Sequence, residues 1–184
     1  NGYSLARKVC VEGKSREELL APVEALGGQS VADALLTPTR IYVKQVLGTL
    51  AACPGAVRAL AHITGGGISE NLNRALNERV DAQVELGSWP VPAVAKYVCD
   101  AAELSEPQAL KTFNMGVGMI LIVDPARAEE VETALAEAVF ELQRPLAFDG
   151  LLGACIWFSA RRTLSRSAVS FLRRRVFHYR PCVI

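Results

Sequence analysis

The chain has 184 residues, of which 51% are hydrophobic and 21% charged, and this composition excludes an intrinsically disordered protein. The 20 Lys and Arg nearly balance the 19 Asp and Glu, so the chain as a whole has no electrostatic attraction toward nucleic acid or a membrane surface. No apolar run is long enough to cross a membrane. The 5 cysteines are odd in number and form no C-x-x-C pair, which argues against a disulfide framework or a zinc site and favours the cytoplasm.

The beginning of the chain is expected to be helical. Its first residues enter a helical pattern without an initiator Met, so we expect a piece of a longer protein. Ser15 precedes a helix in a capping pattern. Pro38 predicts a turn, after which Thr39 is expected to cap a longer helix that ends at Cys53.

The middle of the chain alternates between strands and helices. Apolar residues 57–63 predict a buried strand, and residues 116–123 predict another. Alternating apolar and polar residues over 80–86 predict a third, half-buried strand. Helices are expected over residues 68–76 and 128–138. Strands interleaved with helices predict an α/β domain with layered packing.

A run of three glycines at residues 65–67 separates the first strand from the helix that follows. Each glycine costs about 0.5–1 kcal/mol of ordering relative to Ala, so three together indicate a backbone shape that side chains would block. Free amides at a helix N-terminus attract phosphate or carboxylate. No Gly-Lys-Ser/Thr follows, so this is not a Walker loop. From the residues alone, an anion-binding turn and a tight structural turn both stay open.

Polar residues also precede the second strand. Thr112 and Asn114 lie at its start, while Gly116 and Gly118 leave one face of it open to a backbone or a ligand. A strand packed tightly under a helix is the alternative. His62 ends the first strand without a Cys or Ser nucleophile nearby in the sequence, so a structural histidine is the simpler interpretation. We assign no catalytic residue, and no metal-ligand spacing is found.

Four segments and a Trp-Pro pair carry a resemblance to a known family. The chain reads NGYSLARKV at residues 1–9, LLTPTRIYVK at 35–44, AHITGGGISENL at 61–72 and TFNMGVGM at 112–119, with the Trp-Pro pair at 89–90. In this order the segments resemble the C-terminal domain of aminoimidazole ribonucleotide synthetases, also named phosphoribosylformylglycinamidine cyclo-ligases. The resemblance covers roughly residues 1–138. It implies a three-layer α-β-α domain with a partly ferredoxin-like mixed sheet.

The resemblance also implies a reaction. Members of the family use ATP to close the ring of formylglycinamidine ribonucleotide, which gives aminoimidazole ribonucleotide in de novo purine biosynthesis. Phosphorylation turns the formyl oxygen into a leaving group, and held geometry makes the ring closure effectively unimolecular. ATP and Mg²⁺ are expected to be held mainly by an N-terminal domain that is missing here, so the chain alone would be inactive. The full-length form is expected to be a cytoplasmic homodimer with no membrane or nucleic-acid partner.

In this family the C-terminal domain would form one wall of a cleft that faces the N-terminal domain. The residues expected on that wall, in contact with the substrate or its phosphate, are Asn1, Pro38, Thr39, His62, Thr64, Gly65, Gly66, Gly67, Asn71, Thr112 and Asn114.

Three features depart from the family pattern. Asn73 and Asn77 stand where the family commonly has Pro. Residues 108–111 read QALK where Glu-Met-x-Arg is usual, which removes a carboxylate and a guanidinium. After residue 138 we find neither the final strand nor the glycine turn of the family, so residues 139–184 are set apart as an atypical tail, either an extension or a disordered segment. From Gly150 onward this tail carries seven arginines and no acidic residue.

Two other functions stay open. A sister ATP-dependent enzyme of the same superfamily, such as a selenophosphate synthetase, would share the layered domain but is not expected to share both the 61–72 and 112–119 segments. A non-catalytic module could use the arginine-rich tail to bind nucleic acid or an acidic partner, with a solvated tail as the simpler interpretation.

Overall fold

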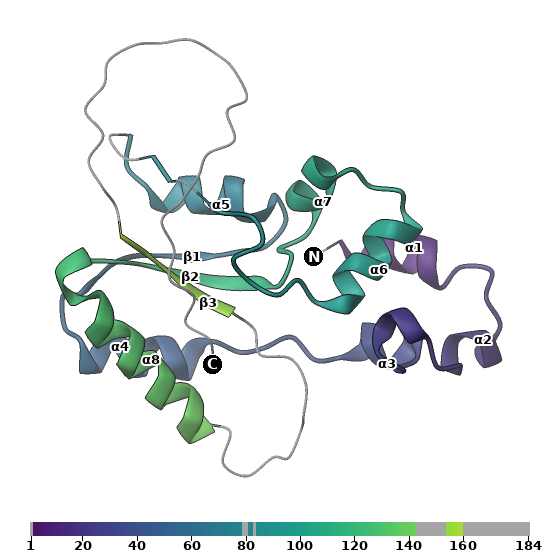
Figure 1. Cartoon of the computed structure of the whole chain (residues 1–184), viewed down its shortest axis with the longest axis horizontal. Helices are drawn as coiled ribbons and strands as arrows, with labels where there is room; N and C mark the ends of the chain where they lie inside the picture. Colours follow the sequence, from purple (N-terminus) through teal and green to yellow (C-terminus); the bar gives the residue numbers. More distant parts are fainter. Residues whose placement is uncertain (1, 79–80, 83, 143–153, 160–184) are drawn as a thin grey trace.

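A computed structural model describes residues 2–78, 81–82, 84–142 and 154–159 of the chain. The centre of this described part is a sheet of three strands in the order β1 (Val57–His62), β2 (Val117–Val123) and β3 (Ala154–Ser159). β1 runs antiparallel to β2, with His62 opposite Met119, whereas β3 runs parallel to β2 (Figure 1). β2 therefore has a hydrogen-bonded neighbour on each side.

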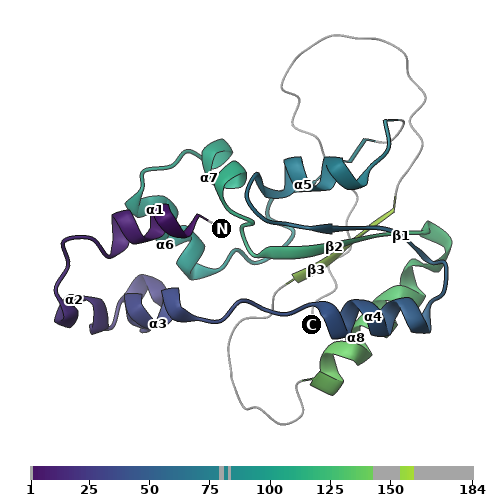
Figure 2. The same ribbon diagram turned by 180° about the vertical axis from the view of Figure 1, so that it is seen from behind.

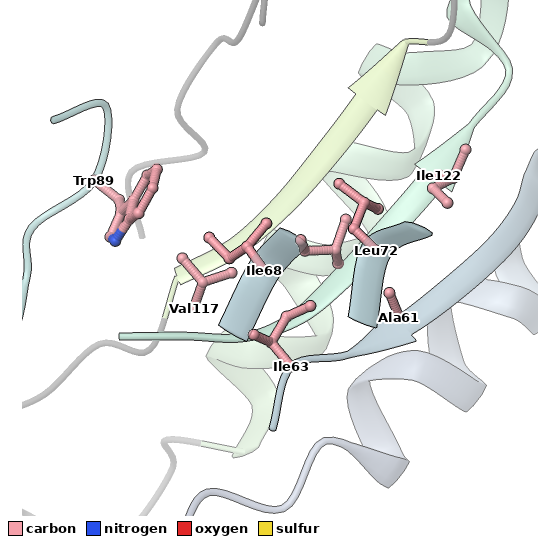
Figure 3. Packing of buried hydrophobic residues seen from close by; sticks show 8 residues of the cluster. Ala61, Ile63, Ile68, Leu72, Trp89, Val117 and Ile122 are labelled. Atoms are coloured by element: carbon pink, nitrogen blue, oxygen red, sulfur yellow. The ribbon is translucent and has the colours of Figure 1, made fainter. Parts of the chain in front are cut away.

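The two faces of the sheet bury different residues of β2, because successive side chains of a strand alternate between faces. On one face Ile120 and Ile122 pack with Ile63 under helix α5 (Gly67–Ala75) (Figure 3). On the other face Leu121 packs with Leu135 of α8 (Ala128–Leu142), which lies beside α4 (Val43–Ala52) (Figure 1). Burial on both faces explains why β2 is an unbroken apolar run.

A second group of helices lies beside the sheet (Figure 2). It comprises α1 (Tyr3–Cys10), α2 (Arg16–Leu20), η1 (Glu24–Leu26), α3 (Val31–Leu36) and α6 (Ala93–Ala101). These helices share a core that includes Ala6, Leu26 and Val98. The expected cap of α2 is confirmed, since the N–H of Glu18 donates to the Ser15 hydroxyl and the N–H of Ser15 donates to the Glu18 carboxylate at 2.7 Å.

Helix α7 (Glu106–Thr112) brings its last turn against the start of α5, while η2 (Pro125–Arg127) leads into α8. Gly67, the first residue of α5, has φ +64°, and a Cβ at this position would overlap the carbonyl oxygen of Leu110. Only glycine suits this position, because a left-handed φ is strained for other residues and the Leu110 backbone leaves no room for a side chain. Gly67 therefore fixes how closely α5 approaches α7.

Several expected elements are confirmed. The strands expected over 57–63 and 116–123 are β1 and β2, and the helix expected after the glycine run is α5. The helix expected over 128–138 is α8, which continues to Leu142. The chain is a mixed α/β protein, as its alternation of strands and helices predicts.

Three expectations are wrong. The described residues within 80–86 are not in a strand; Ala82 and Val84 rest on the core cluster under α5, so their alternation reflects one-sided contact with the core. Thr39 does not cap a helix, because α4 begins four residues later at Val43, after Tyr42. The stretch after residue 138 does contain a strand, β3, whose sequence lacks the alternation on which strand prediction relies.

The contact of Gly67 yields a stability prediction with a matched control. Gly67→Ala combines a left-handed φ with a clash against the Leu110 carbonyl and should lower the free energy of unfolding by about 4 kcal/mol or more. Gly13→Ala also has a positive φ, +77°, but nothing lies within 4 Å of its added methyl, so it should cost only about 1–2 kcal/mol. Urea denaturation of both variants measures the difference. Equal costs would show that the Leu110 contact does not restrict residue 67.

Candidate functional site

Most of the expected site residues gather at the end of the sheet where β1 stops and β2 starts. The strands are antiparallel, so His62 and Val117 lie at the same end, and the N–H of Ile63 donates to the Gly118 carbonyl oxygen at 2.8 Å. The first turn of α5 meets α7 there (Figure 1). The beginning of the chain reaches the same place, because Gly2 lies against the ring of Phe113.

The side chain of Asn71 holds the glycine turn from within α5. It is 7% exposed, and its Nδ2 donates to the carbonyl oxygens of Gly67 at 2.8 Å, Gly65 at 3.1 Å and Thr64 at 3.4 Å. The Thr64 hydroxyl donates to Asn71 Oδ1 at 3.3 Å. The amide group of one side chain thus binds three backbone carbonyl oxygens of the turn, and its two hydrogens are shared among these three acceptors.

These bonds decide where the amides of the turn point. In a trans peptide the C=O and N–H groups point in opposite directions, and the described residues contain no cis peptide bond. Since the carbonyls of Thr64, Gly65 and Gly67 point at Asn71, the N–H groups of Gly65, Gly66 and Ile68 point away from it. The Ile68 N–H also belongs to the first helical turn, which has no intrahelical acceptor. Of these three residues Gly65 is exposed, Gly66 is half-buried and Ile68 is buried. Free N–H groups at the positive end of a helix favour an anion.

The negative charge of Glu70 opposes the binding of an anion at the turn. Gly66 precedes α5 with φ +91°, and the carboxylate of Glu70 packs against it. The same carboxylate lies 3.9 Å from the guanidinium of Arg74. An anion at the turn would meet the Glu70 charge, and the pairing with Arg74 lessens that repulsion.

The side-chain oxygens of Thr112 and Asn114 form hydrogen bonds with the backbone just before β2. The Thr112 hydroxyl donates back to the Gln108 carbonyl oxygen of its own helix at 2.7 Å. Asn114 Oδ1 accepts from the Gly116 N–H at 3.1 Å, in a turn where Met115 and Gly116 have φ of +51° and +95°. The indole N–H of Trp89 donates to the Met115 carbonyl oxygen at 2.9 Å, which holds the same turn from outside.

The open face predicted at the glycines of β2 is filled by protein groups. A Cβ at Gly116 would meet Pro92, and a Cβ at Gly118 would overlap the hydroxyl of Tyr42. The tight structural interpretation therefore holds at both glycines. The Tyr42 ring also stands edge-on to the exposed His62 ring, with centroids 6.1 Å apart and planes at 63°. The sequence motifs do not point to Tyr42 as a site residue, and the one signal for a side chain at this place is the glycine inside a buried strand.

Two of the expected residues make no described contact with the turn, and a third cannot be placed. Pro38 and Thr39 are exposed in the connection between α3 and α4, and among the described contacts no hydrogen bond or ion pair joins them to the glycine turn. Asn1 lies outside the described residues, as does the arginine-rich stretch 160–184 on which the nucleic-acid alternative depends.

The described residues were also searched for a metal site, a membrane-spanning helix and a reactive cysteine. No three His, Cys, Asp or Glu side chains among them gather in a way that could hold a metal ion. No helix in the described part is both long and apolar enough to span a bilayer. Burial raises the pKa of the Cys10, Cys53 and Cys99 thiols, which keeps them protonated core residues.

Comparison with known proteins agrees with the motif resemblance. Residues 1–143 match the family model for the C-terminal domain of AIR synthase related proteins. The chain is 47% identical over 137 residues to a phosphoribosylformylglycinamidine cyclo-ligase of Brevibacillus brevis, and 42% over 137 residues to one of Lactobacillus helveticus. It is 39% identical over 136 residues to one of Bordetella petrii. Each match covers 74% of this chain but 38% of the relative, so the chain spans well under half the length of these relatives.

The bonds of Asn71 can be tested by an isosteric exchange. Asn71→Asp replaces the donor that faces three carbonyl oxygens by a buried negative charge, and should cost about 3 kcal/mol or more at neutral pH. The loss should shrink on acidification, because a protonated carboxyl can donate one hydrogen bond. Asn73→Asp on the exposed side of α5 is the control, with an expected change within about 0.5 kcal/mol. Denaturation at pH 7.5 and 5 measures both, and equal effects would exclude a structural role for the Asn71 amide.

Proposed function

The chain belongs to the family of AIR synthase related protein C-terminal domains, and on that premise we propose that it is the C-terminal, substrate-side part of a phosphoribosylformylglycinamidine cyclo-ligase. The observation that carries the proposal is the glycine turn, in which the hydrogen bonds of Asn71 to three carbonyl oxygens turn the N–H groups of Gly65, Gly66 and Ile68 away from Asn71. A ribonucleotide phosphate suits such a donor set. The proposal extends to the fold, in which the helices on both faces of the sheet would form a three-layer, partly ferredoxin-like α-β-α domain.

The proposed reaction is the ATP-dependent closure of formylglycinamidine ribonucleotide to aminoimidazole ribonucleotide. The amine of the substrate attacks its activated formyl carbon, and the former formyl oxygen leaves with phosphate. The turn amides would bind the phosphate at the other end of the substrate and so limit the positions of the reacting groups, which lowers the entropic part of the barrier. His62 and Thr64, at the end of β1, would contact the ribose or its phosphate. We propose the same wall for Thr112, Asn114, Pro38, Thr39 and Asn1.

ATP and Mg²⁺ would supply the activation of the formyl oxygen. Since no cluster of metal-ligating side chains occurs among the described residues, the proposal leaves Mg²⁺ and most of the ATP contacts to the N-terminal part of the enzyme. That part corresponds to the length of the relatives that this chain does not span. In this account the chain binds and orients the substrate and is inactive alone.

The proposal has three further parts. The complete enzyme would be a homodimer, and it would act in the cytoplasm in purine biosynthesis. Residues 1–138 would form the cyclo-ligase domain, and residues 139–184 would be an otherwise atypical tail that completes α8 and adds β3 to the sheet.

A reconstitution assay tests the proposal. The full chain is mixed with the separately expressed N-terminal part of the Brevibacillus brevis relative, and ATP-dependent formation of aminoimidazole ribonucleotide is followed. We expect product only in the mixture, because each part supplies one wall of the site. The two parts of the Brevibacillus brevis protein itself, mixed in the same way, are the positive control. Product in that control but none with the folded chain would contradict the proposal.

The same assay tests whether Asn71 contributes to product formation. In the reconstituted pair, Asn71→Asp should reduce product formation by about ten-fold or more, because misdirected amides lose the substrate phosphate. Asn73→Asp should leave the rate near that of the unmodified pair. Equal rates for the two variants, both folded, would argue against phosphate binding at the turn.

A further inference from the structure

Gly118 interrupts the large apolar side chains of β2, and the hydroxyl of Tyr42 fills the place that a side chain would take there. A glycine inside a strand weakens the strand and marks the close approach of another group. Valine or isoleucine at residue 118 would fill the same place without bringing a polar hydroxyl against a buried backbone. The glycine therefore serves to admit Tyr42, and core packing alone does not account for it.

Tyr42 joins this buried glycine to the ring of His62. Its hydroxyl lies against Gly118, and its ring stands edge-on to the His62 imidazole, with centroids 6.1 Å apart and planes at 63°. This separation and tilt fall within the range that aromatic pairs prefer. The backbone of Tyr42 is held by α4, because its carbonyl oxygen accepts from the N–H of the buried Val46 at 2.9 Å. The tyrosine is thus fixed at its backbone and at its hydroxyl.

The direction of the His62 side chain is set by side-chain contacts. His62 is exposed at the last position of β1, and β1 is an edge strand of the described sheet. Its backbone is held, because it pairs with Met119 and the next N–H, that of Ile63, donates to the Gly118 carbonyl oxygen at 2.8 Å. Backbone bonds do not fix side-chain torsions, and exposed side chains change rotamer within nanoseconds. The fixed ring of Tyr42 limits the rotamers that the imidazole can adopt.

We propose that Tyr42 is a positioning residue that holds the His62 imidazole in the orientation in which it meets the ribonucleotide. The inference rests on the proposed function, in which His62 contacts the ribose or its phosphate. Tyr42 itself touches no substrate and acts through His62. A substrate bound by its phosphate at the glycine turn is then held at a second point, which restricts the motion of the groups that form the new ring.

Steady-state kinetics of the reconstituted pair test the proposal. Tyr42→Leu removes the ring and should lower kcat about ten-fold while KM stays within about two-fold, because the glycine turn still binds the phosphate. Tyr42→Phe keeps the ring and should recover most of the lost kcat. Tyr97→Leu is the control, because Tyr97 is also half-buried but packs against the core of the second helix group, and it should leave kcat unchanged. Thermal melts establish that each variant is folded.

A double-mutant cycle separates the positioning of His62 from general support of the fold. In the His62→Ala background, Tyr42→Leu should lower kcat no further, because the ring that Tyr42 positions is gone. Losses that multiply in the double variant would show that Tyr42 acts independently of His62. That result overturns the proposal and leaves the proposed function standing. A rise in KM with unchanged kcat for Tyr42→Leu overturns it as well.

Two further outcomes decide the matter without the Tyr42 variants. NMR of the unmodified chain should show Overhauser contacts between the ring protons of Tyr42 and His62, and their absence overturns the proposal whether or not Tyr42→Leu folds. If the unmodified pair forms no product while the two parts of the Brevibacillus brevis protein do, the proposed function fails and this inference fails with it.

Discussion

The arrangement of the candidate site depends on how closely α5 begins against α7. At Gly67 the backbone turns left-handed and passes the Leu110 carbonyl with no room for a side chain. One turn further along α5, Asn71 reaches back to the carbonyl oxygens of residues 64, 65 and 67. The first contact sets where the helix starts and the second sets how the backbone before it is rotated. Together they give the glycine run one defined backbone shape, in which the amides of residues 65, 66 and 68 point away from Asn71.

The glycines of this region are alike in sequence and different in physical role. Gly67, Gly116 and Gly118 permit contact with Leu110, Pro92 and Tyr42 respectively, so they serve packing. Gly65 is exposed, and its N–H points away from Asn71. Our proposal assigns phosphate binding to this last kind of position and not to the packing glycines, so glycine content alone is a weak guide to the site.

The core of the fold follows from the sequence because burial leaves a strong local pattern. β2 is a continuous apolar run bounded by glycine and Asp-Pro, and β1 leads into the glycine turn, so both were predictable. The run at 80–86 misled the prediction, because Ala82 and Val84 lean on the core without joining a ladder. Local alternation reports which side of a segment is buried, and it does not report whether another strand is near enough to pair.

The candidate site was predictable as a set of residues but not as a geometry. Thr64, the glycine run and Asn71 are close in sequence, so their meeting was expected. The role of Asn71 as the donor that rotates the turn depends on the side-chain orientation across a full helical turn. The contact of Tyr42 with His62 and Gly118 joins residues far apart in the chain, and no local pattern specifies it. Motif resemblance identified the segments of the site. The hydrogen bonds of Asn71, which no motif specifies, set the direction of the amides in the glycine turn.

The most direct test of the account is amide mapping by NMR. Isotope-labelled chain, with the unlabelled N-terminal part of the Brevibacillus brevis relative present, is titrated with formylglycinamidine ribonucleotide, and the backbone amide shifts are followed. If the turn binds the substrate phosphate, the amides of Gly65, Gly66 and Ile68 shift most and saturate together, because they bind one phosphate. Shifts that leave these amides unchanged and cluster elsewhere on the chain would contradict it.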